Sequence, residues 1–238
     1  MRILLIPDVH GRPFWNDAIK QHGEECDKII FLGDYVDPYS DEGITRKEAI
    51  KTLEDIIDFK NKNNDKTILL IGNHDAHYAL PSFIRSTRYD ASHAFKIMEL
   101  YKTNEKLFQV AYEETINDKK YLFSHAGLTN SWLNRNKDII GEPTDENLNR
   151  LTMSKKGIDA LAEISKYRTW FGEETGSILW SDLREKIDID KSELDNIIPT
   201  KDSHVKGYDY QIFGHTMVKK PIITDNWACL DCKQAFII

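Results

Sequence analysis

Carboxylate, amide and imidazole side chains recur along this chain in short motifs that also contain glycine. These side chains are common ligands of divalent cations, and glycine lets the backbone approach a compact site closely. The five motifs are DVHG (Asp8 to Gly11), GDYVD (Gly33 to Asp37), GNHD (Gly72 to Asp75), SHAG (Ser124 to Gly127) and GHT (Gly214 to Thr216). Such a set suffices for two divalent ions that share a bridging carboxylate, so the sequence predicts a dinuclear metal site.

Short apolar runs precede the motifs and must position them. A short apolar run bounded by a glycine motif is typical of a buried strand in a central sheet. The runs are Ile3 to Ile6, Lys28 to Leu32, Thr67 to Ile71, Tyr121 to Phe123 and Tyr210 to Phe213. Ligands of open α/β sheets bind at the carboxyl edge of the strands, so we expect the motif side chains to gather there.

Helix and hairpin signals fill the connections between these strands. Thr45 to Glu48 predicts a capping box at the start of one helix, and Ser92 is expected to cap a second helix through Asn104. Apolar positions of the second helix include Phe95, Met98 and Leu100. Further strands are expected at Lys106 to Ile116, Lys119 to Ser124, Pro221 to Thr224 and Trp227 to Ile238, the first two as a hairpin around Asn117 and Asp118.

The length of 238 residues suits one domain, so we expect residues 1–238 to form a single α/β domain. The segment 129–178 carries no metal motif. Its helical patterns lie around Asp145 to Met153 and Gly157 to Phe171, so we interpret it as a helical insertion that shapes substrate access.

Charge and composition limit the partners. With 32 basic and 39 acidic side chains the net charge is −7, which argues against a global field for nucleic acid and leaves local basic patches open. No apolar run approaches the roughly 20 residues of a membrane span. The three cysteines, Cys26, Cys229 and Cys232, are an odd count that fits a reducing compartment. We therefore expect a cytoplasmic protein with no membrane partner.

The motifs resemble those of the calcineurin-like metallophosphoesterases over residues 1 to 231, and most closely those of the phosphoprotein (Ser/Thr) phosphatase branch. GDYVD, Leu122 to Leu128 and Leu179 to Asp182 are similar to motifs of that branch. Met217 stands where many metallophosphodiesterases have a second histidine. The resemblance implies a four-layer α-β-β-α sandwich with central mixed sheets.

The resemblance also implies two divalent metal ions, for which manganese is expected and iron or zinc fits the same ligands. The first metal would take Asp8, His10 and Asp34, and the second Asp34, Asn73, His125 and His215. A hydroxide that bridges the metals would attack phosphorus in line. His74 would act as general acid toward the leaving group, and Asp37 would orient its imidazole.

Two positions depart from the phosphatase pattern. Pro38 and Ile71 stand where that branch has the arginines that clamp phosphate. The candidate replacements are Arg12, Arg46, Arg88, Arg168, Arg184 and Lys206, of which Arg184 ranks first because it follows the LWSD segment. His77 is expected to support the site rather than to bind a metal.

The sequence thus predicts a metal-dependent phosphomonoesterase, with protein Ser/Thr phosphatase activity as one form. Its substrate would be a phosphoprotein, a nucleotide or a small phosphorylated metabolite. The alternatives are a dinucleoside polyphosphate hydrolase and a phosphatase or phosphodiesterase that acts on nucleic-acid ends. A non-enzymatic scaffold of the same fold is disfavoured, because every expected ligand and His74 are present.

Overall fold

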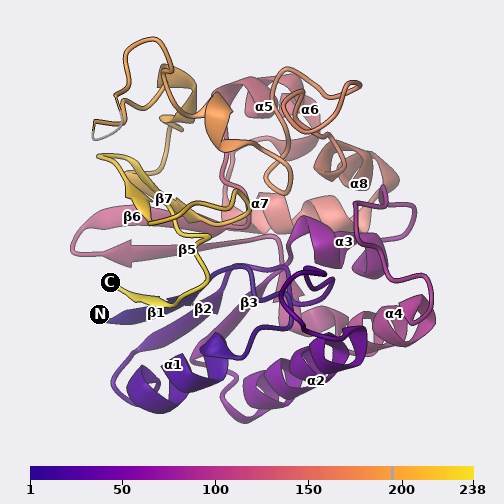
Figure 1. Cartoon of the computed structure of the whole chain (residues 1–238). Coiled ribbons are helices and arrows are strands. Elements are labelled where there is room, and N and C mark those ends of the chain that lie inside the picture. The colour runs from indigo at the N-terminus through magenta and orange to yellow at the C-terminus, as the bar shows by residue number, and fades with distance from the viewer. Residues whose placement is uncertain (194–195) are drawn as a thin grey trace. The chain divides into compact units, whose positions relative to one another are not determined.

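The computed structural model describes residues 1–193 and 196–238. The chain divides into two compact units (Figure 1). Unit 1 comprises Met1–Gln109 and Lys233–Ile238, and unit 2 comprises Val110–Cys232. Each unit contains one mixed sheet with helices, which confirms the predicted α/β class. The expectation of a single domain stays a prediction.

Unit 1 is built on a five-stranded sheet in the order β10-β1-β2-β3-β4. The strands are β1 (Ile3–Ile6), β2 (Lys28–Phe31), β3 (Thr67–Leu70), β4 (Phe108–Gln109) and β10 (Phe236–Ile237). β1 to β4 are parallel, and β10 runs antiparallel to β1 with Leu4 opposite Ile237. Both chain ends therefore lie in neighbouring strands of one sheet, as Figure 1 shows.

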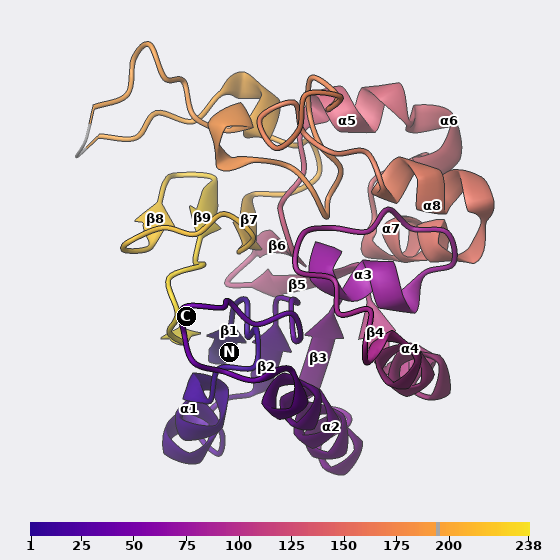
Figure 2. The same ribbon diagram turned by 45° about the vertical axis from the view of Figure 1, so that its right-hand side comes forward.

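Helices connect the parallel strands of unit 1: α1 (Phe14–His22), α2 (Arg46–Lys62), α3 (Asn73–Ala79) and α4 (Ala94–Thr103), with a 3-10 turn η1 (Glu105–Leu107). α1 and α2 lie along one face of the sheet (Figure 2). Trp15 and Leu53 of these helices share a core with β1 and β2. The predicted capping box is confirmed, since Thr45 Oγ1 accepts from Glu48 N at 3.2 Å and Glu48 Oε2 accepts from Thr45 N at 2.7 Å.

The prediction that Ser92 caps α4 was wrong. The carboxylate of Asp90 accepts the backbone N–H groups of Ser92 and His93, and the helix begins at Ala94. Phe95 is 82% exposed, whereas Ile97 and Tyr101 are buried against the core of unit 1. Of the three apolar positions named from the sequence, Leu100 packs against this core, whereas Phe95 and Met98 are exposed.

Unit 2 is built on a second mixed sheet in the order β5-β6-β7-β9-β8. The strands are β5 (Ala111–Ile116), β6 (Lys119–Ser124), β7 (Tyr210–Phe213), β8 (Ile222–Ile223) and β9 (Trp227–Cys229). β5 and β6 form the predicted hairpin, and its turn residues Asn117 and Asp118 have φ of 50° and 62°, the left-handed values of a type I′ turn. The expected strand from Trp227 onward ends at Cys229, and β10 belongs to the other sheet.

The segment 129–178 of unit 2 is helical only in its first two thirds. It contains α5 (Asn130–Arg135), α6 (Lys137–Ile140), α7 (Asp145–Arg150), the 3-10 turn η2 (Leu151–Met153) and α8 (Lys155–Leu161). The predicted helix toward Phe171 instead ends at Leu161. Beyond it, Ile164 O accepts from Glu173 N at 2.7 Å and Glu173 O accepts from Lys166 N at 2.7 Å, so the chain closes into a loop. Two short 3-10 turns follow, η3 (Leu183–Glu185) and η4 (Lys201–Ser203).

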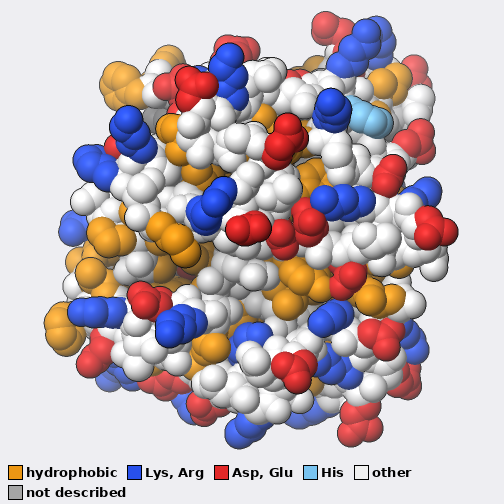
Figure 3. Space-filling model, turned by 180° about the vertical axis from the view of Figure 1, so that it is seen from behind, with side chains coloured by type: hydrophobic (Ala, Val, Ile, Leu, Met, Phe, Trp, Pro, Cys, Tyr) orange, Lys and Arg blue, Asp and Glu red, His pale blue; other side chains and the backbone are white. Residues whose placement is uncertain are grey.

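Acidic and basic side chains are intermixed over the face drawn in Figure 3. Among the described residues, no helix has the length and apolar character needed to cross a membrane.

Candidate active site

Polar residues follow each of the first three strands of unit 1. Asp8 lies two residues beyond β1, Asp34 follows β2, and Asn73 begins α3 after β3; all three are buried. Asp8, His10, Asp34 and Asp37 have φ of 30°, 45°, 57° and 58°. Residues other than glycine rarely adopt this left-handed region, and such strain concentrates at functional sites.

His10 directs an imidazole lone pair at Asp34. Its Nδ1 lies 2.9 Å from the carbonyl oxygen of Val36, which can only accept, so Nδ1 carries the proton. Burial lowers the pKa of His10 well below 6.5, and Asp34 opposes this shift. The neutral ring therefore presents Nε2 as an acceptor, 3.4 Å from Asp34 Oδ2.

The carboxylates of Asp8 and Asp34 have oxygens within 4.8 Å of one another. These oxygens and His10 Nε2 are buried ligand atoms at close spacing, with His10 Nε2 3.4 Å from Asp34 Oδ2. Oxygen and imidazole donors of this kind suit manganese, iron or zinc, so the residues present fit a divalent ion.

Asp75 holds Asp34 in place, a role that the sequence reasoning missed. Its carboxylate accepts the N–H groups of Asp34, Tyr35 and Gly72 at 2.6, 2.9 and 2.8 Å, and the hydroxyl of Tyr101 at 2.6 Å. Burial, followed by the charge of Asp34, raises the pKa of Asp75. Its four donors nevertheless require acceptor oxygens and so favour the ionised form. A side chain at Gly72 would overlap the Asp34 carboxylate, which explains the glycine of GNHD.

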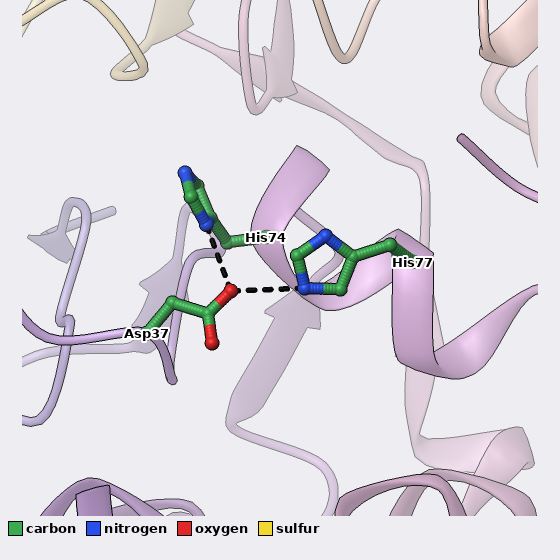
Figure 4. Close-up of side chains that lie close together, drawn as sticks. All are labelled: Asp37, His74 and His77. Atoms are coloured by element: carbon green, nitrogen blue, oxygen red, sulfur yellow. Dashed lines mark hydrogen bonds and ion pairs between the residues drawn. The ribbon is translucent and has the colours of Figure 1, made fainter. Parts of the chain in front are cut away.

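His74 and Asp37 form a buried pair (Figure 4). His74 Nδ1 lies 2.9 Å from Asp37 Oδ2, and His74 Nε2 lies 2.9 Å from Arg88 Nη2. A guanidinium can only donate, so Nε2 accepts and the proton on Nδ1 is donated to Asp37. Burial would raise the pKa of Asp37, but hydrogen bonds from His74 and His77 outweigh it and lower that pKa. Asp37 is thus an ionised group that orients the imidazole.

His77 approaches the same carboxylate oxygen from one helical turn further on (Figure 4). Its Nε2 lies 2.9 Å from Asp37 Oδ2, and its Nδ1 accepts from Ser86 N at 3.2 Å. Asp37, His74 and His77 have ligand atoms within 4.8 Å of one another, a spacing that suits an ion. The imidazole lone pairs, however, already accept from Ser86 and Arg88. This geometry favours the supporting role predicted for His77.

Arg88 is the candidate cation that the structure places against His74. Its Nη1 donates to the carbonyl oxygen of Asp37 at 2.8 Å, and its guanidinium carbon lies 3.6 Å from the centroid of the Tyr39 ring. Its φ is 65°. Arg88 is one of the six phosphate-binding candidates predicted from the sequence, among which Arg184 ranked first.

Unit 2 brings His125 and His215 together. They follow β6 and β7, two neighbouring parallel strands, and so leave the sheet at the same edge. His125 Nε2 lies 3.1 Å from His215 Nδ1, and the ring of Trp180 contacts that of His215 with centroids 5.9 Å apart. Two imidazole nitrogens at this distance either share one proton or direct lone pairs at one cation.

Arg184, ranked first from the sequence as the phosphate-binding residue, is paired with a carboxylate in unit 2. Its Nε and Nη2 donate to Asp182 at 2.7 and 3.0 Å, and Nη2 also donates to the carbonyl of Tyr167 at 2.8 Å. Arg168 joins the same carboxylate, with its Nε 2.7 Å from Asp182 Oδ2, and donates to Thr216 Oγ1 at 2.8 Å. The role of Arg184 stays a prediction.

Comparison with known proteins identifies the family. The model of a family described as calcineurin-like phosphoesterase matches residues 1–219. No curated protein matches the chain. Among solved structures, the cold-active protein-tyrosine phosphatase of a psychrophile, Shewanella sp., is similar with a TM-score of 0.60 and 17% identity, over 99% of this chain and 74% of that one. A protein serine/threonine phosphatase from Saccharomyces cerevisiae matches at 20% identity with a TM-score of 0.34, over 54% of this chain and 38% of that one.

The family model spans most of the chain, whereas the likeness to the Shewanella enzyme shows a shared fold. The match is to the family as a whole, and it implies metal-dependent phosphoester hydrolysis. The chain therefore belongs to the calcineurin-like phosphoesterase family.

Proposed function

We propose that this calcineurin-like phosphoesterase is a dinuclear, metal-dependent phosphomonoesterase. Its substrates would be phosphorylated proteins, nucleotides or small metabolites. The observation that carries the proposal is the gathering of ligand atoms: buried carboxylate oxygens of Asp8 and Asp34 lie within 4.8 Å of one another, and His10 Nε2 lies 3.4 Å from Asp34 Oδ2. Oxygen and imidazole donors at this spacing suit a divalent ion. The Asp37–His74 pair in the same unit supplies an oriented imidazole for proton transfer.

Six side chains would hold two divalent ions, with manganese as the first choice. They are Asp8, His10, Asp34, Asn73, His125 and His215. Asp34 would be a ligand of both ions. Bound ions would activate a water for attack on phosphorus and offset charge on the phosphoryl oxygens.

His74 would protonate the leaving-group oxygen. The observed tautomer has its proton on Nδ1, toward Asp37, so Nε2 is the atom that would carry the transferable proton. Asp37 would keep the ring in this orientation through its hydrogen bond with Nδ1. The single histidine of GHT, followed by Met217, supports a phosphomonoester rather than a phosphodiester substrate.

The test is metal content measured beside hydrolysis. The chelated protein should be inactive, and added manganese should restore hydrolysis of an aryl phosphate monoester more than that of an aryl diester. Inductively coupled plasma analysis should then find two ions per chain. One ion per chain, or hydrolysis that chelation does not change, would contradict the proposal. A preference for the diester or for dinucleoside polyphosphates would favour the alternative substrate classes.

Asp34→Asn is the informative variant, because the amide keeps the size of the side chain and removes the bridging charge. It should lose metal and lower kcat by roughly a thousandfold, since a metal contributes several kcal/mol to the transition state. Asp41→Asn is the matched control, because Asp41 is exposed and lies seven residues further along the same segment. It should keep both metals and full activity.

A further inference from the structure

The loop that follows α3 carries a half-buried cation into the neighbourhood of His74. Arg88 donates from Nη1 to the Asp37 carbonyl at 2.8 Å and from Nη2 to His74 Nε2 at 2.9 Å. Its guanidinium lies over the Tyr39 ring at 3.6 Å, a distance at which cation–π attraction holds it in place. Three groups therefore fix where this charge sits.

Arg88 differs from the other candidate arginines in the groups that surround its guanidinium. Each of the others has a carboxylate within 4 Å: Glu42 for Arg12, Asp90 for Arg46, and Asp182 for both Arg168 and Arg184. Within residues 1–193 and 196–238, Arg88 forms no ion pair with a carboxylate. A guanidinium withdrawn from water without an anion is unfavourable, so an anionic ligand would complete its environment.

The backbone of Arg88 supports the same conclusion. Its φ of 65° places a residue with a long side chain in the left-handed region, which costs about 1 kcal/mol or more in residues other than glycine. The carbonyl that receives Nη1 belongs to Asp37, the residue directly before Pro38. The guanidinium thus reaches the end of the GDYVD motif from a loop about fifty residues away.

We propose that Arg88 binds the phosphoryl group of the substrate and selects dianionic phosphomonoesters. A guanidinium has five N–H groups, of which two make the contacts with Asp37 and His74, so it can also donate to a pair of phosphoryl oxygens. Transfer of Nη2 from His74 to a phosphoryl oxygen would release Nε2 for the proton that the leaving group needs. This assignment rests on the proposed phosphatase function.

Calorimetry with inorganic phosphate and the manganese-loaded protein is the direct test. Arg88→Ala should weaken phosphate binding by roughly 10- to 100-fold, the worth of one charge-assisted hydrogen bond or two. Arg88→Lys should recover part of the loss, because lysine keeps the charge without the planar fork. The matched control is Arg85→Ala, an exposed arginine of the same loop whose guanidinium lies 4.6 Å from the centroid of the Tyr89 ring. It should bind phosphate as the wild type does.

Kinetics separate phosphate binding from a positioning role. If Arg88 binds phosphate, Arg88→Ala should raise KM for an aryl monoester by a similar factor and change the diester less, because the diester carries one charge fewer. If Arg88 only positions His74, kcat should fall while phosphate affinity stays at the wild-type value. That second pattern, or phosphate affinity in Arg88→Ala equal to that of Arg85→Ala, overturns the assignment.

The assignment and the proposed function can fail separately. Phosphate calorimetry needs no turnover, so it tests Arg88 even in a protein that hydrolyses none of the substrates. Circular dichroism and metal content of each variant check that the fold and the ions are retained. Should Arg88→Ala fail to fold, Arg88→Lys with its conserved charge still gives the affinity comparison.

Discussion

Asp34 of unit 1 and Asp182 of unit 2 are both buried carboxylates, but different kinds of group face them. In unit 1, His10 Nε2 faces Asp34 Oδ2 at 3.4 Å although both atoms are acceptors. In unit 2, the buried carboxylate of Asp182 has a donor from Arg168 and another from Arg184, each at 2.7 Å. A buried carboxylate paired with arginines is satisfied within the fold, whereas carboxylate and imidazole ligand atoms gathered in one place suit a divalent cation.

Lys186 extends the pattern of unit 2. It is fully buried, contacts Ser181 Oγ, and lies 5.1 Å from the centroid of the Phe213 ring. Ser181 Oγ donates in turn to Glu185 Oε2 at 2.6 Å. Burial lowers the pKa of Lys186, and the nearby Glu185 and then Asp182 oppose that shift. Burial alone therefore does not identify a functional group. The kind of atom that faces the buried charge distinguishes a functional group from a structural one.

The largest expected effect comes from His74. Its replacement would show whether the buried His74–Asp37 pair of unit 1 takes part in catalysis or only supports the fold. His74→Asn should lower kcat by about 10²–10⁴-fold and keep both metals, because a positioned general acid contributes that much. The loss should be smaller for an aryl phosphate, whose leaving group needs little protonation, than for an alkyl phosphate. Asp37→Asn should show a milder form of this pattern. Steady-state kinetics on both substrates and metal analysis measure it.

His93 provides the control for that experiment. Its Nδ1 lies 2.7 Å from Asp90 Oδ2, so it forms a histidine–aspartate pair of similar geometry on another segment of unit 1. His93→Asn should leave kcat unchanged. Equal losses on aryl and alkyl substrates in His74→Asn, or loss of metal, would mean that His74 is a ligand or a structural residue.

A moderate effect is expected from Asp182, on stability rather than on metal binding. Asp182→Asn removes the charge that Arg168 and Arg184 share, and the free energy of unfolding should fall by about 1–3 kcal/mol, as for hydrogen bonds to charged groups. The two arginines are partly exposed and can be hydrated, which keeps the loss below that of a fully buried pair. Urea unfolding measures it, with Asp159→Asn as the exposed control. Loss of metal in Asp182→Asn would contradict the structural role that we assign to this carboxylate.

The same variant has a predicted pH dependence. Burial would raise the pKa of Asp182, but the hydrogen bond from Arg184 and the charge of Arg168 outweigh it and hold that pKa below 3.8. A depressed pKa in the folded state stabilises the protein above the unfolded value and loses that effect as pH falls through the folded value. The gap in unfolding free energy between wild type and Asp182→Asn should therefore close below about pH 4.

The smallest effect is expected from Arg184. Its side chain is half exposed, and Arg168 remains on Asp182 when Arg184 is removed. Arg184→Ala should change the unfolding free energy by less than about 1 kcal/mol, as for other exposed pairs. Its KM for an aryl phosphate should rise less than that of Arg88→Ala. A larger rise in KM for Arg184→Ala than for Arg88→Ala would mean that Arg184, in unit 2, binds the phosphate.

The structural features that could be predicted from the sequence are those that depend on residues close together in the chain. The capping box of α2 depends on Thr45 and Glu48 alone, so its signal lies within four residues. The buried face of α4 depends on the core beneath it, and the apolar residues Phe95 and Met98 are exposed whereas Ile97 and Tyr101 are buried. Propensity and periodicity cannot decide between two stripes of similar hydropathy when tertiary packing makes the choice.

The same distinction applies to the site. Asp8, Asp34 and Asn73 could be placed together because each follows a parallel strand. Arg88 comes 14 residues after His74, from a loop without periodicity. The absence of arginine at Pro38 indicated that a cation must come from elsewhere, and no local pattern identified which one.

The pairing of β10 with β1 matters during synthesis. Leu4 pairs with Ile237, so the outer edge of β1 stays uncovered while the whole of unit 2 is translated. At about 5 to 20 residues per second, synthesis from Leu4 to Ile237 takes roughly 10 to 50 seconds. An uncovered strand of four apolar residues is a template for pairing with other nascent chains. We therefore expect the yield of overproduced protein to depend on chaperone supply, even in variants whose chemistry is intact.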